Sequence, residues 1–393
     1  MTTAIALFEG LARSFGWWLR ALVAWRDPLA PMSARRVGML LVGMPLFLLL
    51  QLGHIVGLLL DELLFSGYRR TAVERPLFIT GIPRSGTTFL HRTLAAETEA
   101  YTTLTTWEAV LAPSITQRRL IRALARLDGA LGGRGAAGLN ALTRRITGDL
   151  DAIHAVGMGS AEEDYLTLLP AGGCFVLLLA FPGAPGLRAL GRADRALSAE
   201  RRRRLLHLYR RLLQRHLYAD GGERRLLSKN AAFGGWVDGL RETFPDARFI
   251  LCLREPEAAF SSQISAVAGA GTLFGTAVDR APFQTLFLEL LAATLDHLAG
   301  TIPDWPRECA VIVDMDDLRA EPATTILSAL ARLGESPGTA LTARLAALSA
   351  VGSGSAHHHA VEDLALPRER LTSRLRPAYR ILMADPHRVG DTP

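Results

Sequence analysis

Residues Pro76–Leu94 read PLFITGIPRSGTTFLHRTL, and this stretch decides the fold. The apolar run Leu77–Thr80 predicts a short buried strand, a glycine-bounded loop follows it, and the residues from Phe89 onward predict a helix. In a strand–loop–helix unit of this kind, backbone N–H groups of the loop and of the helix N-terminus point at one spot and bind an anion there. The predicted anion-binding residues are those of the loop: Pro83, Arg84, Ser85, Gly86, Thr87 and Thr88.

The loop differs from a Walker A loop at one decisive position. Its spacing is G-x-x-x-x-G-T-T, so Thr87 stands where a Walker loop has the lysine that reaches the β- and γ-phosphates. The cation lies inside the loop instead, as Arg84. A site of this type suits a nucleotide with a short 5′ anionic arm and has no evident group for a triphosphate tail.

Residues 78–94, FITGIPRSGTTFLHRTL, closely resemble the 5′-phosphosulfate loop of the sulfotransferases that use 3′-phosphoadenosine 5′-phosphosulfate (PAPS). Arginine rather than lysine inside the loop is the form found in bacterial members and in the tyrosylprotein branch. The resemblance implies an α/β fold of the P-loop type, with a doubly wound parallel sheet flanked by helices. It also implies PAPS as the sulfuryl donor and no metal.

Two further segments carry the same resemblance. Arg254 ends an apolar run and Ser262 lies eight residues further on, as in the family's 3′-phosphate motif; a guanidinium fork and a hydroxyl are donors that match phosphate oxygens. Lys229, the single lysine among 44 basic residues, resembles the family lysine that lies beside the phosphosulfate. An ammonium there would stabilise charge on the bridging oxygen. The resemblance thus implies nucleotide contacts for Arg254 and Ser262 and catalytic roles for Lys229 and Arg84.

Sulfuryl transfer also needs a base that takes the proton of the acceptor. Glu108 is the first candidate, because it follows the loop helix at a position similar to that of a glutamate that does this work in the tyrosylprotein branch. The second candidate is a cluster in which a histidine lies near three acids: His154, Glu162, Glu163 and Asp164. A carboxylate desolvated in an apolar pocket has its pKa raised toward the working pH, as a base requires.

The remaining sequence predicts one large α/β domain with an N-terminal appendage. Apolar runs at 226–228, 247–253 and 311–313 predict further buried strands, and the helical stretches between them favour parallel pairing. The expected boundary divides residues 1–71 from the catalytic domain, 72–393. Three scattered cysteines form no disulfide or metal pattern, which is typical of a reducing compartment.

Residues 1–71 predict a membrane-associated region. An amphipathic stretch at 7–25 precedes the uncharged run Val37–Leu60, which is long enough to span a bilayer but is interrupted by Pro45, Gly53 and Gly57. A straight span with the arginine-rich N-terminus inside would export the catalytic domain from the cytoplasm, where PAPS is made in bacteria. We therefore expect a monotopic or re-entrant anchor formed by residues 1–65 on the cytoplasmic side of the inner membrane. A Golgi membrane is the alternative for a eukaryotic protein.

The leading hypothesis is a sulfotransferase that moves a sulfuryl group from PAPS to a hydroxyl or amine of a small, hydrophobic or lipid-like acceptor. The apolar stretch Ala171–Gly186 is the candidate wall of the acceptor pocket. The net charge of +6 suits an anionic ligand or membrane surface, and no nucleic-acid-binding motif accompanies it. Two alternatives stay open: a P-loop kinase or NTPase, which the missing Walker lysine disfavours, and a non-catalytic membrane-bound scaffold. Retention of the four candidate ligand and catalytic residues argues against the scaffold: Arg84, Lys229, Arg254 and Ser262.

Overall fold

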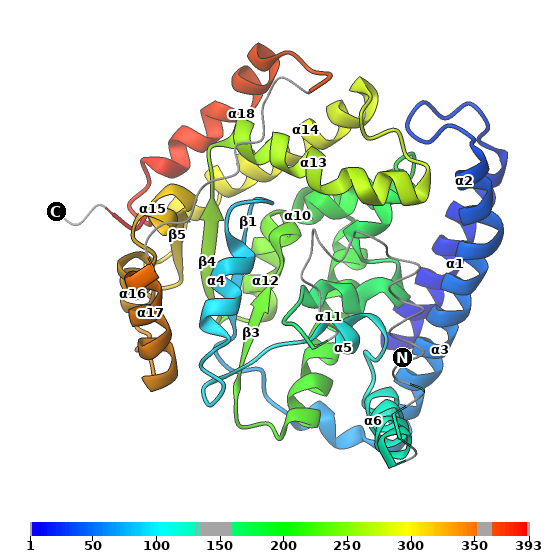
Figure 1. Ribbon diagram of the computed structural model, residues 1–393, viewed down its shortest axis with the longest axis horizontal. Helices are drawn as coiled ribbons and strands as arrows, with labels where there is room; N and C mark the ends of the chain where they lie inside the picture. The colour runs from blue at the N-terminus through cyan, green and yellow to red at the C-terminus, as the bar shows by residue number, and fades with distance from the viewer. Residues whose placement is uncertain (1, 131, 134, 136–158, 352–363, 391–393) are drawn as a thin grey trace.

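A parallel sheet organises the computed structural model, which describes the chain except residues 1, 131, 134, 136–158, 352–363 and 391–393. Within the described residues the strands lie in the order β2 (Tyr101–Thr102), β3 (Arg225–Lys229), β1 (Leu77–Gly81), β4 (Arg248–Leu253) and β5 (Ala310–Asp314). Each neighbouring pair is parallel. The sheet confirms the predicted α/β class and places the predicted loop strand, β1, at its centre (Figure 1).

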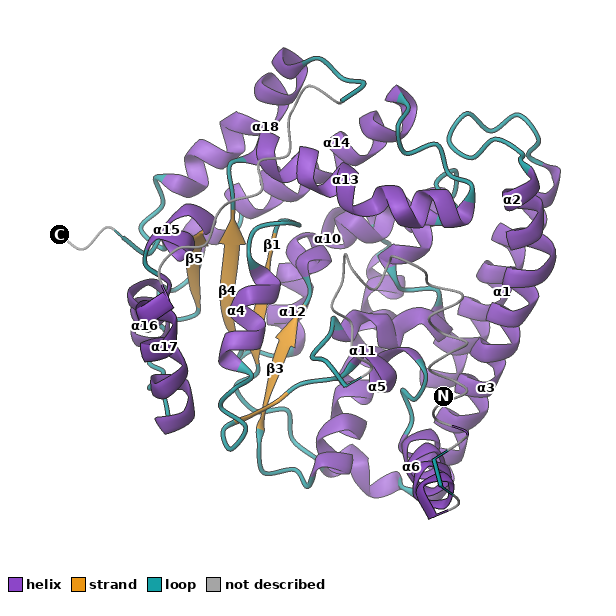
Figure 2. Cartoon of the chain, viewed as in Figure 1, coloured by secondary structure: helices purple, strands orange, loops and turns teal. Residues whose placement is uncertain are grey.

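Helices cover both faces of the sheet, so its strands are buried between two layers (Figure 2). Alternate side chains of β1 therefore enter different cores: Leu77 and Ile79 pack with Leu90 of the following helix, whereas Phe78 stacks on Phe249 with ring centroids 5.4 Å apart. The longer helices are α1 (Thr2–Val23), α3 (Met44–Leu64), α4 (Thr87–Leu94), α6 (Ile115–Ala130), α11 (Ala199–Asp220), α12 (Val237–Thr243), α13 (Pro256–Phe274), α14 (Ala281–Ala299), α16 (Pro322–Arg332), α17 (Thr339–Val351) and α18 (Arg368–Met383).

The N-terminal helices share the larger apolar core with the rest of the chain. Leu7 and Trp17 of α1 and Leu58 of α3 are buried in this core. Gly10 of α1 lies so close to Ala171 that a Cβ atom at Gly10 would be 2.2 Å from the carbonyl carbon of Ala171. Helices α1 and α3 therefore pack onto the body of the protein, on the right of Figure 1.

Residues Ala34–Leu64 form one helical run, composed of α2 (Ala34–Gly38), a π-helical turn (Met39–Gly43) and α3. Pro45 stands in the first turn of α3, directly after the π-helical turn, where the missing backbone N–H is tolerated. The helix continues through Gly53 and Gly57. The helix is thus continuous at these two glycines, and the break that a re-entrant hairpin would need there is not formed. Gly57 instead permits close packing of α6, since a Cβ atom there would lie 2.6 Å from Ser114 Oγ.

A fully buried ion pair fastens the far end of α3 to the body. Arg215 of α11 donates from Nε to Asp61 Oδ2 at 3.0 Å and from Nη2 to Glu62 Oε1 at 2.7 Å. The Asp61 carboxylate also accepts hydrogen bonds from the backbone N–H groups of Ile115 and Thr116 at the start of α6, each at 2.8 Å, and from the Thr116 hydroxyl at 2.7 Å. Asp61 thus joins three helices, and removal of its cation would leave a buried charge without its main partner.

We predict that Arg215→Met lowers the free energy of unfolding by roughly 3–5 kcal/mol, the usual cost of breaking a buried ion pair from one side. Urea titration of the purified protein measures it. The matched control is Arg374→Met, whose guanidinium pairs with Glu289 and Asp296 at the surface, so that a loss below about 1 kcal/mol is expected. Equal losses in the two variants would contradict the structural role of the buried pair.

Candidate active site

The loop between β1 and α4 has backbone conformations that favour glycine. Gly81 has φ +126°, and a Cβ atom there would lie 2.1 Å from the carbonyl oxygen of Cys252 on β4. Gly86 has φ +87° and directly precedes α4, which begins at Thr87, earlier than predicted. Arg84 is also left-handed, with φ +65°, and strain of this kind in a non-glycine residue is found mainly at functional sites. Left-handed residues ahead of a helix N-terminus form an anion-binding concavity.

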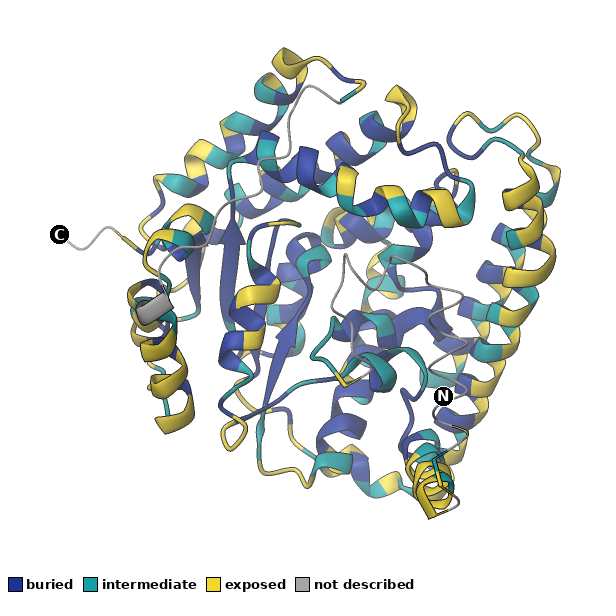
Figure 3. Cartoon of the chain, viewed as in Figure 1, coloured by how far each residue is buried: buried dark blue, intermediate teal, exposed yellow. Residues whose placement is uncertain are grey.

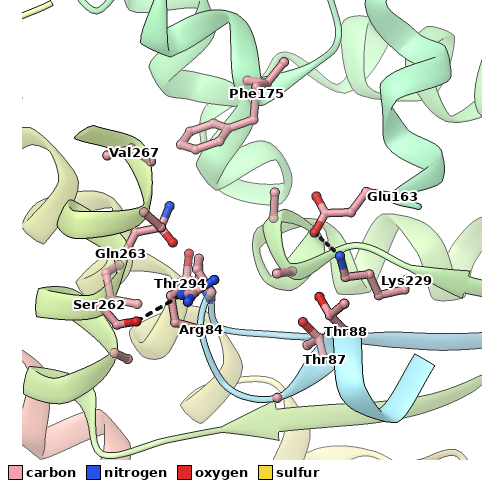
Figure 4. Close-up of a pocket in the computed structure, with 18 of the residues that line it drawn as sticks. Arg84, Thr87, Thr88, Glu163, Phe175, Lys229, Ser262, Gln263, Val267 and Thr294 are labelled. Atoms are coloured by element: carbon pink, nitrogen blue, oxygen red, sulfur yellow. Dashed lines mark hydrogen bonds and ion pairs between the residues drawn. The ribbon is translucent and has the colours of Figure 1, made fainter. Parts of the chain in front are cut away.

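The structure brings the predicted phosphate ligands together at this loop. Arg84 Nε donates to Ser262 Oγ on α13 at 3.0 Å (Figure 4). Arg254, which follows β4, donates from Nη1 to the carbonyl oxygen of Arg84 at 3.3 Å. Two motifs about 170 positions apart in sequence thus meet, because β1 and β4 are adjacent parallel strands that end at the same edge of the sheet.

The guanidinium groups at this edge are crowded with one another. Burial lowers the pKa of Arg84, and burial together with the positive charges of Arg319 and Arg84 lowers the pKa of Arg254. Like charges held together disfavour the charged form of each group, and a bound anion relieves that repulsion. This end of the site is therefore suited to a phosphate group.

Lys229 lies at the end of β3 with two glutamates in front of it. Its Nζ is 2.7 Å from Glu163 Oε1 and 4.0 Å from Glu162 Oε1, and the first contact is drawn in Figure 4. The ammonium and the carboxylate both line the same cavity as the loop residues Arg84 and Thr87. A cation and a carboxylate therefore lie side by side where the loop, β3 and the glutamate segment, residues 162–165, meet.

A buried polar network holds the glutamate segment against the end of β3. Asp164 Oδ1 accepts hydrogen bonds from the Tyr209 hydroxyl at 2.8 Å and from the side-chain amide of Asn230. In return Asn230 Oδ1 accepts from the backbone N–H of Tyr165 at 2.9 Å. Burial raises the pKa of Asp164 to about 6. Since Asn230 follows Lys229 and Asp164 follows Glu163, this network fixes the lysine–glutamate pair.

The cavity has a volume of about 870 Å³ and two unlike ends. The polar end carries Arg84, Arg254, Ser262 and Arg319. The other end is apolar and includes the predicted pocket wall within Ala171–Gly186; its lining residues are Phe175, Val176, Leu179, Ala266, Val267, Ala270, Phe287, Leu290 and Leu291. Lys229 and Glu163 line the same cavity and lie to the lower right of Phe175, above Thr87 and Thr88, in Figure 4.

Glu108 is not among the residues that line this cavity. It occupies the third position of the short helix α5 (Thr106–Val110), where its carboxylate accepts a hydrogen bond from the backbone N–H of Thr105 at 3.1 Å in a capping box. Its other oxygen is 3.6 Å from the buried Arg118 and 3.4 Å from Arg122. The carboxylate predicted as the base is thus committed to a structural network. His154, the alternative, lies outside the described residues.

Several lining residues have no counterpart among the sequence-based predictions. Arg319 follows β5 on α15 (Met315–Ala320), and Thr294 and Phe287 come from α14. For Arg319 a weak signal existed, since it stands six residues beyond the predicted strand 311–313, whereas Arg254 directly follows its strand. For α14 there was none, because its contribution depends on how the helix packs over the sheet.

The chain belongs to the sulfotransferase family: residues 76–145 and 183–336, more than half of its length, match the family profile. Its fold is similar to that of sulfotransferase STF1 from Mycobacterium tuberculosis, with a TM-score of 0.69 and 18% identity over 94% of this chain and 92% of that one. Sulfotransferase STF9 from Mycobacterium avium gives a TM-score of 0.70 and 18% identity over 98% and 96%. No curated protein matches the sequence. Family and fold together identify a sulfotransferase with bacterial structural neighbours.

We predict that Arg254→Ala and Ser262→Ala each weaken binding of adenosine 3′,5′-bisphosphate by roughly 1.5–3 kcal/mol, the contribution of a hydrogen bond to a charged group. Isothermal titration calorimetry of the folded variants measures it. Arg307→Ala is the control, because Arg307 is exposed and lies outside the cavity lining. Wild-type affinity in Arg254→Ala would remove the phosphate assignment from this end of the cavity.

Proposed function

We propose that this protein transfers a sulfuryl group from PAPS to a hydroxyl or amine of a hydrophobic, lipid-like acceptor. One observation carries the proposal: a single cavity joins a cationic end to an apolar end, and the Lys229–Glu163 pair lines the same cavity. The cationic end suits the two anionic groups of PAPS. The apolar end suits an acceptor whose body is hydrocarbon and whose hydroxyl reaches the junction.

The nucleotide contacts follow from the placement of the donors. The loop of residues 83–88 and the N-terminus of α4 would hold the 5′-phosphosulfate, as backbone N–H groups at helix N-termini do. Arg254 and Ser262 would hold the 3′-phosphate, and the nearby Arg319 adds a second guanidinium to that end. No metal takes part in this scheme.

The chemistry is an in-line displacement at sulfur. The acceptor oxygen forms a bond to sulfur, the bond from sulfur to the bridging phosphate oxygen breaks, and adenosine 3′,5′-bisphosphate leaves. Lys229 and the loop N–H groups stabilise the negative charge that develops on that oxygen. Glu163 takes the acceptor proton, a role that its position in the cavity supports and that the buried capping role of Glu108 does not.

The test of the function is incubation with ³⁵S-labelled PAPS and the separated lipid, glycan and protein fractions of the source cells. We expect label in the lipid fraction. Absence of label in every fraction, with adenosine 3′,5′-bisphosphate still bound, would favour the scaffold alternative. Tight binding of Mg²⁺–ATP in place of the bisphosphate would favour a P-loop kinase or NTPase.

We predict that Glu163→Gln keeps nucleotide affinity and lowers turnover by about 10²–10⁴-fold, the usual contribution of a general base. The same ³⁵S assay measures turnover on the labelled fraction. Glu108→Gln is the matched comparison: its effect should appear as lower thermal stability, with turnover of the folded protein retained. A reversed pattern would return the role of base to Glu108.

We also propose that the protein lies on the membrane as a monotopic enzyme. Only 28% of the most apolar part of the helix Ala34–Leu64 is buried, and Leu49 and Leu63 on its outer side are 64% and 80% exposed (Figure 3). Its inner side carries Gln51, His54 and Asp61, all buried on the body. A second apolar run, Ala281–Asp304, is also long enough to cross a bilayer, but half of it is buried inside the protein. A span through Ala34–Leu64 would strip Asp61 from Arg215, whereas insertion of the outer side alone keeps that pair.

We predict that intact spheroplasts protect tags at both ends of the chain from added protease, because both lie on the cytoplasmic side. Digestion of the C-terminal tag from outside would contradict this placement.

In a vesicle flotation assay, Leu49→Glu and Leu63→Glu should weaken binding to the vesicles about tenfold or more, since a charge opposes insertion of an apolar face. Leu327→Glu, at an exposed leucine on α16 far from this face, is the control.

A further inference from the structure

Two helical segments form much of the apolar end of the cavity, and their C-terminal ends lie next to each other. The 3₁₀ helix η4 (Phe175–Leu179) contributes Phe175 and Leu179, and its next residue is Ala180. Helix α13 contributes Val267 and Ala270 and ends at Phe274. The separation of these two ends therefore bears directly on the width of the apolar end.

One nitrogen atom of the N-terminal region joins both ends. Nη1 of Arg36, on α2, donates to the carbonyl oxygen of Ala180 at 2.6 Å and to that of Phe274 at 3.0 Å. The Arg36 residue is 3% exposed, and its guanidinium carbon lies 5.8 Å from the centre of the Phe181 ring. Gly275 has φ +66° and lies against Arg36, so that a Cβ atom there would be 2.9 Å from Arg36 Cβ.

Further hydrogen bonds around Arg36 connect the residues that follow α13 to η4 and to the N-terminal region. The Thr276 hydroxyl donates to the carbonyl oxygen of Leu179 at 2.6 Å, which links the two walls directly. The backbone N–H of Ala277 donates to the carbonyl oxygen of Leu29 at 2.9 Å, in the connection between α1 and α2. Arg35 also reaches α13, donating to the Thr272 carbonyl at 3.2 Å, but from an exposed position.

We propose that Arg36 is a positioning residue that sets the width of the apolar end of the cavity and couples it to the membrane-facing helix. Buried hydrogen bonds from a charged donor are stronger than those from a neutral donor. Loss of the guanidinium would remove this donor from the carbonyls of Ala180 and Phe274, at the ends of η4 and α13. Arg36 belongs to the same helical run whose outer side is apolar and exposed. Contact with a bilayer and the shape of the apolar end thus depend on one helical element.

The identity of the ligand in this inference, a hydrophobic acceptor, rests on the proposed function. The consequence for the enzyme is specific: loss of Arg36 should impair use of the acceptor and spare the nucleotide. The bisphosphate contacts lie at the opposite end of the cavity, on Arg84, Arg254 and Ser262. A general loss of folding would affect both ends alike.

The experiment is hydrogen–deuterium exchange on Arg36→Met, with Arg35→Met as the matched control on the neighbouring residue. Peptides that cover residues 174–181 and 266–276 should exchange about tenfold faster in Arg36→Met than in the wild type, because their shared tie is lost. Arg35→Met should exchange at the wild-type rate in residues 174–181. Adenosine 3′,5′-bisphosphate affinity should stay unchanged in both variants. Vesicles of phosphatidylcholine and phosphatidylglycerol should slow exchange in both peptides of the wild type and lose this effect in Arg36→Met.

Equal exchange in Arg36→Met and Arg35→Met, or a change confined to one wall, would overturn the proposal. If Arg36→Met is not folded and does not bind the bisphosphate, Arg36→Lys is measured in its place, with Arg35→Lys as its control. Residues 174–181 and 266–276 must then both exchange faster in Arg36→Lys than in Arg35→Lys. The second readout uses the total lipid extract with ³⁵S-labelled PAPS, where the apparent KM for the extract should rise about tenfold with the KM for PAPS unchanged. The exchange measurement does not depend on catalytic turnover. It therefore distinguishes failure of the proposed function from failure of the proposed coupling between Arg36 and the apolar end of the cavity.

Discussion

Parallel pairing of β1 with both β3 and β4 is the constraint on which the site depends. The register pairs Ile79 with Lys229 and Gly81 with Cys252, so the three strands end at one edge of the sheet. The glycine loop, the lysine and Arg254 each follow one of those strand ends. Residues separated by some 150 positions therefore meet because the backbone ladder sets their height along the sheet, and hydrogen bonds such as that from Arg84 to Ser262 join motifs that the strands have already brought together.

The same constraint explains how much of the site the sequence could predict. Arg84, Lys229 and Arg254 could be placed from the sequence because each follows an apolar run, and parallel strand ends coincide. Ser262 could be placed only by its offset of eight residues from Arg254, which resembles the family motif. For Glu108 the position relative to the loop gave no geometry, and the structure puts this residue outside the cavity lining, in the capping box whose pattern Thr105-x-x-Glu108 also has. The residues of α14 were beyond prediction, since only tertiary packing places that helix over the cavity.

The N-terminal region shows a different limit of sequence reasoning. Length and hydropathy describe the helix Ala34–Leu64 as a whole and do not separate its two sides. Its buried side is anchored by Asp61, whose partner Arg215 lies more than 150 positions away on α11. The pairing that distinguishes an attached helix from a free span is therefore visible only in three dimensions.

The scarcity of lysine makes the centre of the cavity chemically distinct from the rest of the protein. The sequence contains no second lysine, so the ε-amine of Lys229 and the α-amino terminus are the aliphatic amines that an acylating reagent meets. Lys229 is 6% exposed and reachable through the cavity that it lines. An activated ester on a hydrocarbon tail that fits the apolar end would thus label a single interior position, and would report directly on access to the cavity.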